Sequence, residues 1–170
     1  MISDTEYAKA LFFKASGAAT AAIVLGQRGH YDADLSLPSV ISAAFSLELY
    51  LRSMLALEKK FPPKVLHDLL DLFIKLSPET QGAIRSSANP LIKRSMKNLK
   101  AEATRLNAPI AKLPSSVEEC LARSRNAFVG LRYIFESKND VPAEWFGTSI
   151  SNATRDAILS RHPEWGEASG

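Results

Sequence analysis

One segment, residues 36–60, is apolar on nearly every side and constrains the fold more than any other part of the sequence. Between Ser36 and Glu58 its only charged residues are Glu48 and Arg52. Apolar residues recur at helical spacing on one side of the segment and also fill its flanks, a pattern typical of a helix that several others contact. We therefore predict a buried central helix over residues 36–60, with Ser36 as its N-cap.

The chain has 170 residues, a length typical of a single domain with a sizeable core. Its net charge of +3 permits an anionic partner such as nucleic acid without requiring one. Cys120 is the only cysteine, which excludes an internal disulfide and favours a reducing, cytoplasmic location. Because Asp4 and Glu6 lie near the start and charges interrupt every long apolar stretch, we expect neither export nor a membrane partner.

Helical periodicity extends over most of the remaining chain. Residues 4–28 carry a stripe made mostly of alanine, whose small side chains favour close packing against the central helix. A short amphipathic run begins near His67 and ends at Ser77-Pro78. The region 78–106 is a long helix that we expect to be interrupted or kinked at Asn89-Pro90, because proline removes a helix hydrogen bond. In its second half an apolar stripe is formed by Ile92, Met96, Leu99, Ala103 and Leu106.

The last third of the chain predicts two more helices. Ser115 or Ser116 can cap a helix that runs to about residue 137, and Trp145 and Phe146 suggest an aromatic anchor for the tail. A short terminal helix ends before Pro163. Since no segment alternates apolar and polar residues as a half-buried strand would, the fold class is all-α, a bundle of about five or six helices.

The bundle is expected over residues 1–147. Residues 148–170 are expected to form a C-terminal helix and tail of the same domain, weakly fixed by packing.

Several sequence motifs that mark large enzyme classes are absent. The chain has no phosphate-binding loop, no dinucleotide-binding glycine pattern, no nucleophile elbow and no HExxH. His30, His67 and His162 are far apart in sequence and have no cysteine cluster beside them. We therefore predict neither a metal site nor a cofactor.

Two polar pairs are candidates for a site. His67 and Asp68 stand where a helix begins, and we interpret them as a structural capping pair. Glu48 and Arg52 are one helical turn apart in the central helix and can form an ion pair. Such a buried pair either stabilises the fold or marks a pocket for a small ligand.

A basic stripe is a third candidate. Between Arg85 and Lys112 the only acidic residue is Glu102. Lys93, Lys97 and Lys100 share one helix face that borders the apolar stripe, where they could contact phosphates in a shallow groove. The alternative is a solvated helix face, because no aromatic residue interleaves the lysines for base stacking.

Three segments together resemble the HEPN superfamily of small helical bundles, found in toxin–antitoxin, phage-defence and nucleotidyltransferase-associated proteins. The resemblance covers residues 35–137 and depends on Glu48 in the central helix, His67-Asp68-Leu69 at a helix start, and Arg125-Asn126 in the late helix. It implies a helical bundle that commonly forms a homodimer.

Active members of that superfamily resemble metal-independent ribonucleases with an arginine, a polar residue and, four to six residues further on, a histidine. In this chain the positions that follow Arg125 at that spacing are Gly130, Leu131 and Arg132, so the motif is degenerate. A second formal match, Arg155-Asp156 with His162, lies in the C-terminal helix, outside the segment that carries the family's motif.

These observations lead to one functional expectation and two alternatives. We expect a non-catalytic, HEPN-like interaction protein, homodimeric, that binds a protein partner or RNA in a defence or toxin–antitoxin type of context. Its binding residues would be Arg125, Asn126 and Arg132 together with the three lysines of the basic stripe. The alternatives are a ribonuclease that uses Arg155, Asp156 and His162, and a small-ligand-binding bundle.

Overall fold

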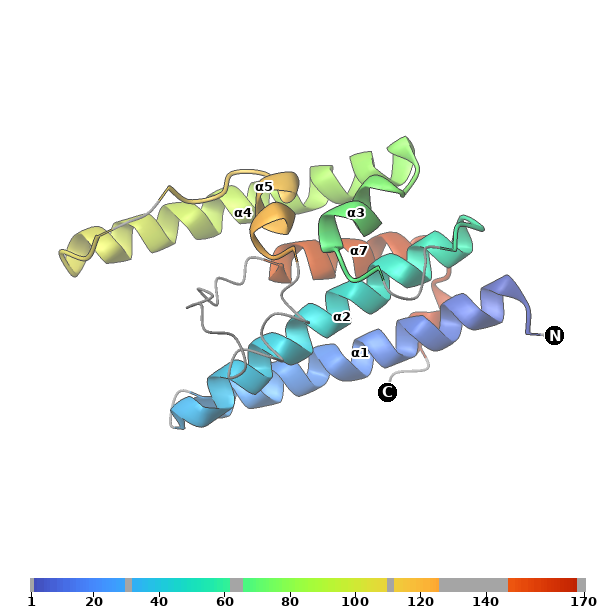
Figure 1. Cartoon of the computed structure of the whole chain (residues 1–170), viewed down its shortest axis with the longest axis horizontal. Helices are drawn as coiled ribbons and strands as arrows, with labels where there is room; N and C mark the ends of the chain where they lie inside the picture. The colour runs from blue at the N-terminus through green and yellow to red at the C-terminus, as the bar shows by residue number, and fades with distance from the viewer. Residues whose placement is uncertain (1, 30–31, 62–65, 110–111, 126–146, 168–170) are drawn as a thin grey trace.

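The computed structural model describes residues 2–29, 32–61, 66–109, 112–125 and 147–167. These residues form helices joined by turns and irregular segments, and they contain no strand, which confirms the predicted all-α class. Figure 1 shows two long helices lying side by side and a third long helix on the far side of a shorter one. The elements are α1 (Asp4–Gly29), η1 (Ala33–Leu35), α2 (Ser36–Leu57), α3 (Leu69–Ile74), α4 (Pro78–Arg105), α5 (Val117–Arg123), α7 (Thr148–Leu159) and α8 (Glu164–Glu167).

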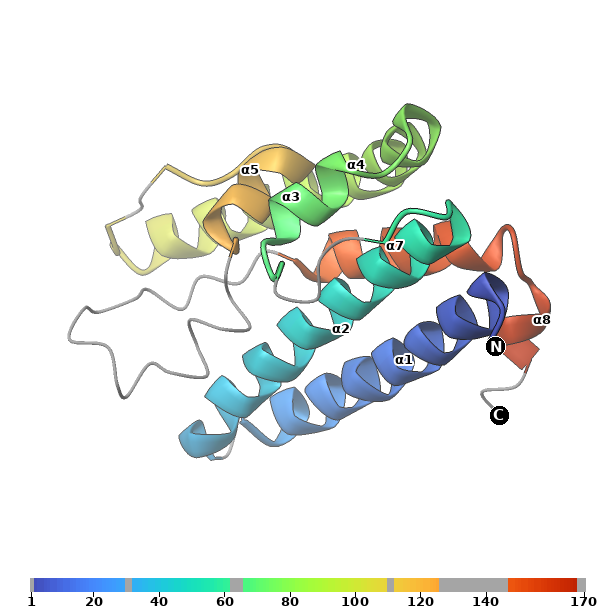
Figure 2. The same cartoon turned by 45° about the vertical axis from the view of Figure 1, so that its right-hand side comes forward.

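Helix α2 is the centre of the bundle, as its sequence predicts. It packs against α1, α3 and α7 (Figure 2). Its second half is buried almost completely. The helix begins at Ser36, but Leu35 occupies the N-cap position without a side-chain hydrogen bond, so the prediction of Ser36 as the cap is wrong. The helix ends at Leu57 rather than at residue 60, because Lys59 adopts a left-handed backbone with φ of 57°.

Serine hydroxyls join α1 and α2 along their length. Ser39, Ser46 and Ser53 of α2 donate hydrogen bonds of 2.8, 2.9 and 2.8 Å to backbone carbonyls of α1. The acceptors, Ala22, Ala15 and Ala8, recur at the same seven-residue interval in the opposite direction, which fixes an antiparallel register. Such bonds require backbones that approach closely, and the alanine stripe of α1 provides that approach.

Helix α4 is continuous from Pro78 to Arg105, so the predicted interruption at Asn89-Pro90 is not found. Pro90 lies on the exposed side of the helix, where the carbonyl that lacks its usual amide donor can be solvated. The side chain of Asn89 instead accepts a hydrogen bond of 3.0 Å from the backbone nitrogen of Val117. Proline therefore does not end this helix.

Only the first half of α4 is buried in the bundle, through Thr80, Ile84, Ala88 and Ile92. The second half projects beyond the other helices (Figure 1). Leu99 and Leu106, which the apolar stripe places inward, are 48% and 59% exposed. The stripe is therefore buried only at its start, and the second half of α4 offers a surface to solvent.

The C-terminal segment is fixed by packing, contrary to the sequence-based expectation. Helix α7 packs between α2 and α4, and its Ile150 and Ile158 are fully buried. Trp165 of α8 is 2% exposed and lies 5.5 Å from the ring of Phe12. Trp165 thus anchors the C-terminal segment. The predicted aromatic anchor, Trp145 and Phe146, lies outside the described residues.

Helix α5 is shorter than its sequence predicts. Ser116 caps it, with its hydroxyl accepting a hydrogen bond from the backbone nitrogen of Glu119, as expected. The helix ends at Arg123 and a turn follows, so it does not run continuously to residue 137. Just beyond this end, the carbonyl of Arg125 accepts a hydrogen bond of 3.0 Å from the backbone nitrogen of Leu69.

Two helices, α1 and α2, are each long and apolar enough to span a membrane by length and composition alone. The same test is passed by core helices of soluble proteins, and 61% of the apolar window of α2 is buried inside the fold. In α1 the corresponding share is 22%. The second half of α1 therefore presents apolar side chains on the surface.

Candidate functional site

A buried carboxylate in α2 holds the segment that precedes α3. Glu48 is 3% exposed and accepts a hydrogen bond of 2.9 Å from Nε of Arg52. It also lies 2.9 Å from Nδ1 of His67, within hydrogen-bonding distance. Arg52 in turn donates to the carbonyl of Leu66. The expected Glu48–Arg52 pair is thus present, and it extends to His67.

A second ion-pair cluster lies at the N-terminus of α3. Asp68 is the N-cap, and its Oδ1 accepts a hydrogen bond of 3.0 Å from the backbone nitrogen of Asp71. The other oxygen of Asp68 lies 2.5 Å from Nε of Arg125, and Asp71 lies 3.3 Å from Nη2 of the same arginine. Asp68 therefore caps the helix as predicted, whereas His67 makes its contact with Glu48 instead.

These two clusters bring together five of the residues that the sequence singles out, namely Glu48, Arg52, His67, Asp68 and Arg125. Their charges compensate one another, because each acid faces at least one basic group. Asp71, which also pairs with Arg125, belongs to the second cluster and was not among the candidates predicted from the sequence. The one sequence signal that could have identified it is its position three residues after Asp68, at the start of the same helix. Asn126 and Arg132 lie outside the described residues.

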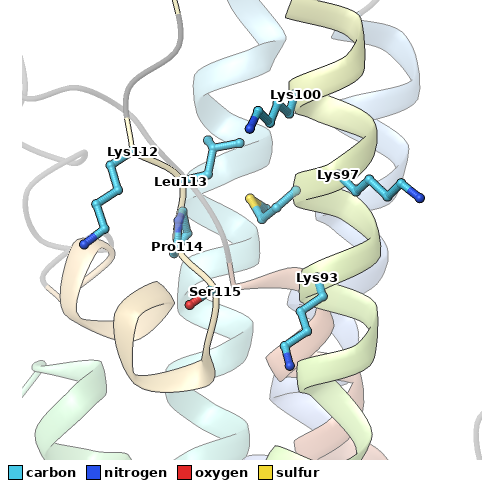
Figure 3. Close-up of a pocket in the computed structure, with 8 residues that line it drawn as sticks. Lys93, Lys97, Lys100, Lys112, Leu113, Pro114 and Ser115 are labelled. Atoms are coloured by element: carbon cyan, nitrogen blue, oxygen red, sulfur yellow. The ribbon is translucent and has the colours of Figure 1, made fainter.

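The basic stripe lines a cleft of about 580 Å³ between the second half of α4 and the segment 112–115, which we call the lysine cleft. Three lysines of α4, Lys93, Lys97 and Lys100, stand on one side, and Lys112 stands on the other (Figure 3). None of the residues that line the cleft is acidic. Lys112 was part of the basic stripe in sequence, but its place opposite the α4 lysines could not be read from the pattern.

One acidic side chain lies beside the cleft without lining it. Glu119 accepts hydrogen bonds from the backbone nitrogen and the hydroxyl of Ser115, at 2.6 and 3.0 Å. These bonds, with smaller contributions from Lys112 and Arg123, lower the pKa of Glu119. Glu119 therefore interacts with Lys112 at the edge of the cleft, whereas the three α4 lysines have no acidic residue among the residues that line it.

Arg155 and His162, the two basic residues of the C-terminal motif, have different neighbours. Arg155 lies 3.6 Å from Asp156 and contributes to the environment of the Tyr50 hydroxyl. The ring of His162 stacks on Trp165 at 4.3 Å with an interplanar angle of 13°, and its Nδ1 lies 3.1 Å from Glu164. The described contacts therefore direct the two side chains to different neighbours rather than to one reacting group.

Two other titratable groups are held in their neutral forms. Burial raises the pKa of Tyr50, and this effect outweighs the hydrogen bond with Ser16 and the influence of Arg155, which lower it. Burial raises the pKa of the Cys120 thiol to about 11. Because the thiolate is the reactive form, Cys120 is a packing residue rather than a nucleophile.

A second, smaller cleft of about 230 Å³ lies among α1, α2 and the start of α7. Its lining is uncharged and consists largely of small residues, including Ala19, Ala22, Ala43 and Ser151. Neither this cleft nor the lysine cleft is lined by Glu48 or Arg52. Within the described part of the chain, no group of three or more histidine, cysteine or acidic side chains could hold a metal ion.

Comparison of the chain with protein-family models, with curated proteins and with solved structures gave no match.

Proposed function

We propose that this chain is a non-catalytic, HEPN-like interaction protein of the cytoplasm that acts as a homodimer and binds an anionic partner, a protein or RNA. The lysine cleft is the observation that carries the proposal. Four lysines surround a cleft of about 580 Å³, and no acidic side chain lines it to neutralise them. Such a concentration of positive charge attracts phosphates or carboxylates and accelerates their association.

The ion-pair clusters support a structural role for the polar residues that carry the resemblance to the HEPN superfamily, namely Glu48, His67, Asp68 and Arg125. Arg125 faces Asp68 and Asp71, so its charge is compensated within the fold. Glu48 is occupied by Arg52 and His67. Metal-free RNA cleavage needs a proton acceptor and a cation within reach of one phosphate, and Gly130, Leu131 and Arg132 provide no acceptor after Arg125. Asn126 and Arg132 remain proposed binding residues.

An uncharged surface on α1 and α2 supports the homodimer. No charged residue occurs from Ala15 to Gln27 of α1 or from Ser36 to Leu47 of α2. On α1, Ile23 and Val24 are 61% and 45% exposed. A second copy of the chain that packed on this surface would bury it in an isologous interface, the commonest form of self-association.

RNA binding and cleavage test the proposal in one experiment. The purified full chain is incubated with labelled single-stranded RNA in the presence of a chelator, and binding and integrity of the RNA are both followed. We expect salt-sensitive binding that Lys97→Glu weakens, with no cleavage products. Cleavage that both Arg155→Ala and His162→Ala abolish, without unfolding the protein, would instead establish the C-terminal pair as a ribonuclease site. If the protein neither bound nor cleaved the RNA, the small-ligand-binding bundle would remain as the alternative.

A further inference from the structure

The lysine cleft combines two kinds of surface. Figure 3 shows Lys100 reaching across the cleft toward Leu113, Lys97 turning outward on the far side of α4, and Lys93 and Lys112 lying on opposite sides. Lys93, Lys100 and Lys112 form a basic rim. Between them the lining is apolar and consists of Met96, Leu113 and Pro114.

The apolar floor is firmly placed. Met96 packs against the hydrophobic core, and Pro114 is buried where the chain returns toward α5. Farther along the same helix, Leu99 and Leu106 are 48% and 59% exposed. An apolar strip therefore runs from the floor of the cleft onto the projecting half of α4. A ligand that gained only from charge would leave this strip in contact with water.

Nucleic acid would satisfy only part of this surface. Its phosphates would face the lysines, but bases held by proteins usually stack on aromatic rings, and no aromatic side chain lines the cleft. An acidic amphipathic helix satisfies both parts, because its carboxylates face the rim while its aliphatic side chains cover the floor. Charge complementarity and the apolar floor thus favour a protein segment over RNA.

We infer that the lysine cleft binds an acidic amphipathic helical segment of a partner protein. This inference rests on the proposed function and specifies its partner. The spacing of the lysines agrees with it: Lys93 and Lys100 are about 10 Å apart along α4, the distance that separates acids placed two turns apart on a partner helix. Carboxylates at i and i+7 of the segment would match these two lysines.

Three probes test the inference on the full chain by fluorescence anisotropy at about 0.15 M salt. The first is a labelled synthetic peptide of about 14 residues, roughly four helical turns, with leucine along one face and glutamate on the others. The second has the same composition in a scrambled order that removes the apolar face. The third is a single-stranded oligouridine of matched charge. We expect the amphipathic peptide to bind at least about tenfold more tightly than either other probe, the gain from burying one aliphatic side chain.

Matched variants locate the binding. Lys100→Glu and Leu113→Ser are expected to weaken binding of the amphipathic peptide about tenfold, whereas Lys14→Glu, the same charge change on exposed α1, leaves it unchanged. Lys100→Ala serves as a second rim variant, and circular dichroism verifies the fold of each protein.

The outcomes separate the inference from the proposed function. Equal binding of the scrambled peptide would overturn the inference, because charge alone would then explain the affinity. Tighter binding of oligouridine would also overturn it, while the proposed function would stand with RNA as the partner. If none of the three probes bound, both would fail.

Discussion

The Nδ1 atom of His67 lies 2.9 Å from a carboxylate oxygen of Glu48, which joins the segment before α3 to the centre of the buried helix α2. The same carboxylate is held by Arg52 from one turn farther along α2. Glu48 is therefore the common acceptor for two basic side chains that come from different parts of the chain. We therefore expect Glu48 to stabilise the fold.

Glu48→Ala should lower the free energy of unfolding by about 2 to 4 kcal/mol, because it leaves the mostly buried guanidinium of Arg52 without its carboxylate. His67→Ala should cost less, about 0.5 to 2 kcal/mol, since that side chain is 38% exposed and Arg52 still compensates Glu48. Urea denaturation measures both. Glu102→Ala, which removes an exposed acid paired with Arg105, is the control and should change stability by under about 0.5 kcal/mol. A Glu48→Ala protein as stable as the control would mean that the cluster does not hold the fold.

The serine contacts between α1 and α2 give a second stability prediction. Ser46→Ala and Ser53→Ala each remove a hydroxyl that donates to a carbonyl of α1 and should each cost about 1 kcal/mol. Ser87→Ala, at an exposed position of α4, should leave stability unchanged or raise it slightly, because alanine has the higher helix propensity. Thermal denaturation compares the three. Equal melting temperatures for all three variants would show that these serine hydrogen bonds do not contribute to stability.

The sequence predicts elements whose causes are local. The apolar pattern of residues 36–60 identified the buried helix, and Asp68 and Ser116 were recognisable as caps because a capping residue acts within its own first turn. Pro90 shows the limit of that reasoning. Proline usually ends a helix, but at an exposed position the unpaired carbonyl is solvated and the packing of Ile84, Ala88 and Ile92 preserves the helix.

The site depends on contacts between distant segments, which one sequence does not reveal. Nothing near Arg125 in the sequence indicates that Asp68 and Asp71 compensate its charge. Lys112 was visible as part of a basic run, but only the return of the chain along α4 places it opposite Lys100. Trp165 was overlooked because the terminal segment contains few apolar residues, and its burial depends on Phe12 of α1.

The pH dependence of stability tests the role of Glu58. Burial alone would raise the pKa of its carboxyl, but hydrogen bonds from Thr80, Ser77 and Lys60 outweigh that effect and lower it below its ordinary value of 4.5. The stabilisation is therefore complete above that value and is lost as the pH falls through the folded pKa. Glu58→Gln should destabilise the protein by about 1 to 3 kcal/mol near neutral pH, and the difference from wild type should shrink at about pH 3. A difference that stays constant over this range would contradict the assignment.

The homodimer proposal predicts a change of mass. Val24→Glu places a charge on the uncharged surface of α1 and should convert a dimer to a monomer without unfolding it. Leu91→Glu is the matched control, because Leu91 is also 45% exposed but lies on α4. Light scattering with size-exclusion chromatography distinguishes them. A wild-type protein that is monomeric at micromolar concentration, or a dimer that Leu91→Glu disrupts and Val24→Glu does not, would refute the proposed interface.

Protection of individual lysines from acetylation tests the binding cleft most directly. The full chain is treated briefly with an acetylating reagent, alone and with a saturating amount of either the amphipathic peptide or oligouridine, and each lysine is quantified by mass spectrometry. We predict that the bound ligand protects Lys93, Lys100 and Lys112, while Lys9 and Lys14 of α1 react equally in all samples. Protection of the α1 lysines with no change at Lys93, Lys100 and Lys112 would place the anionic partner elsewhere and contradict the proposed function of the cleft.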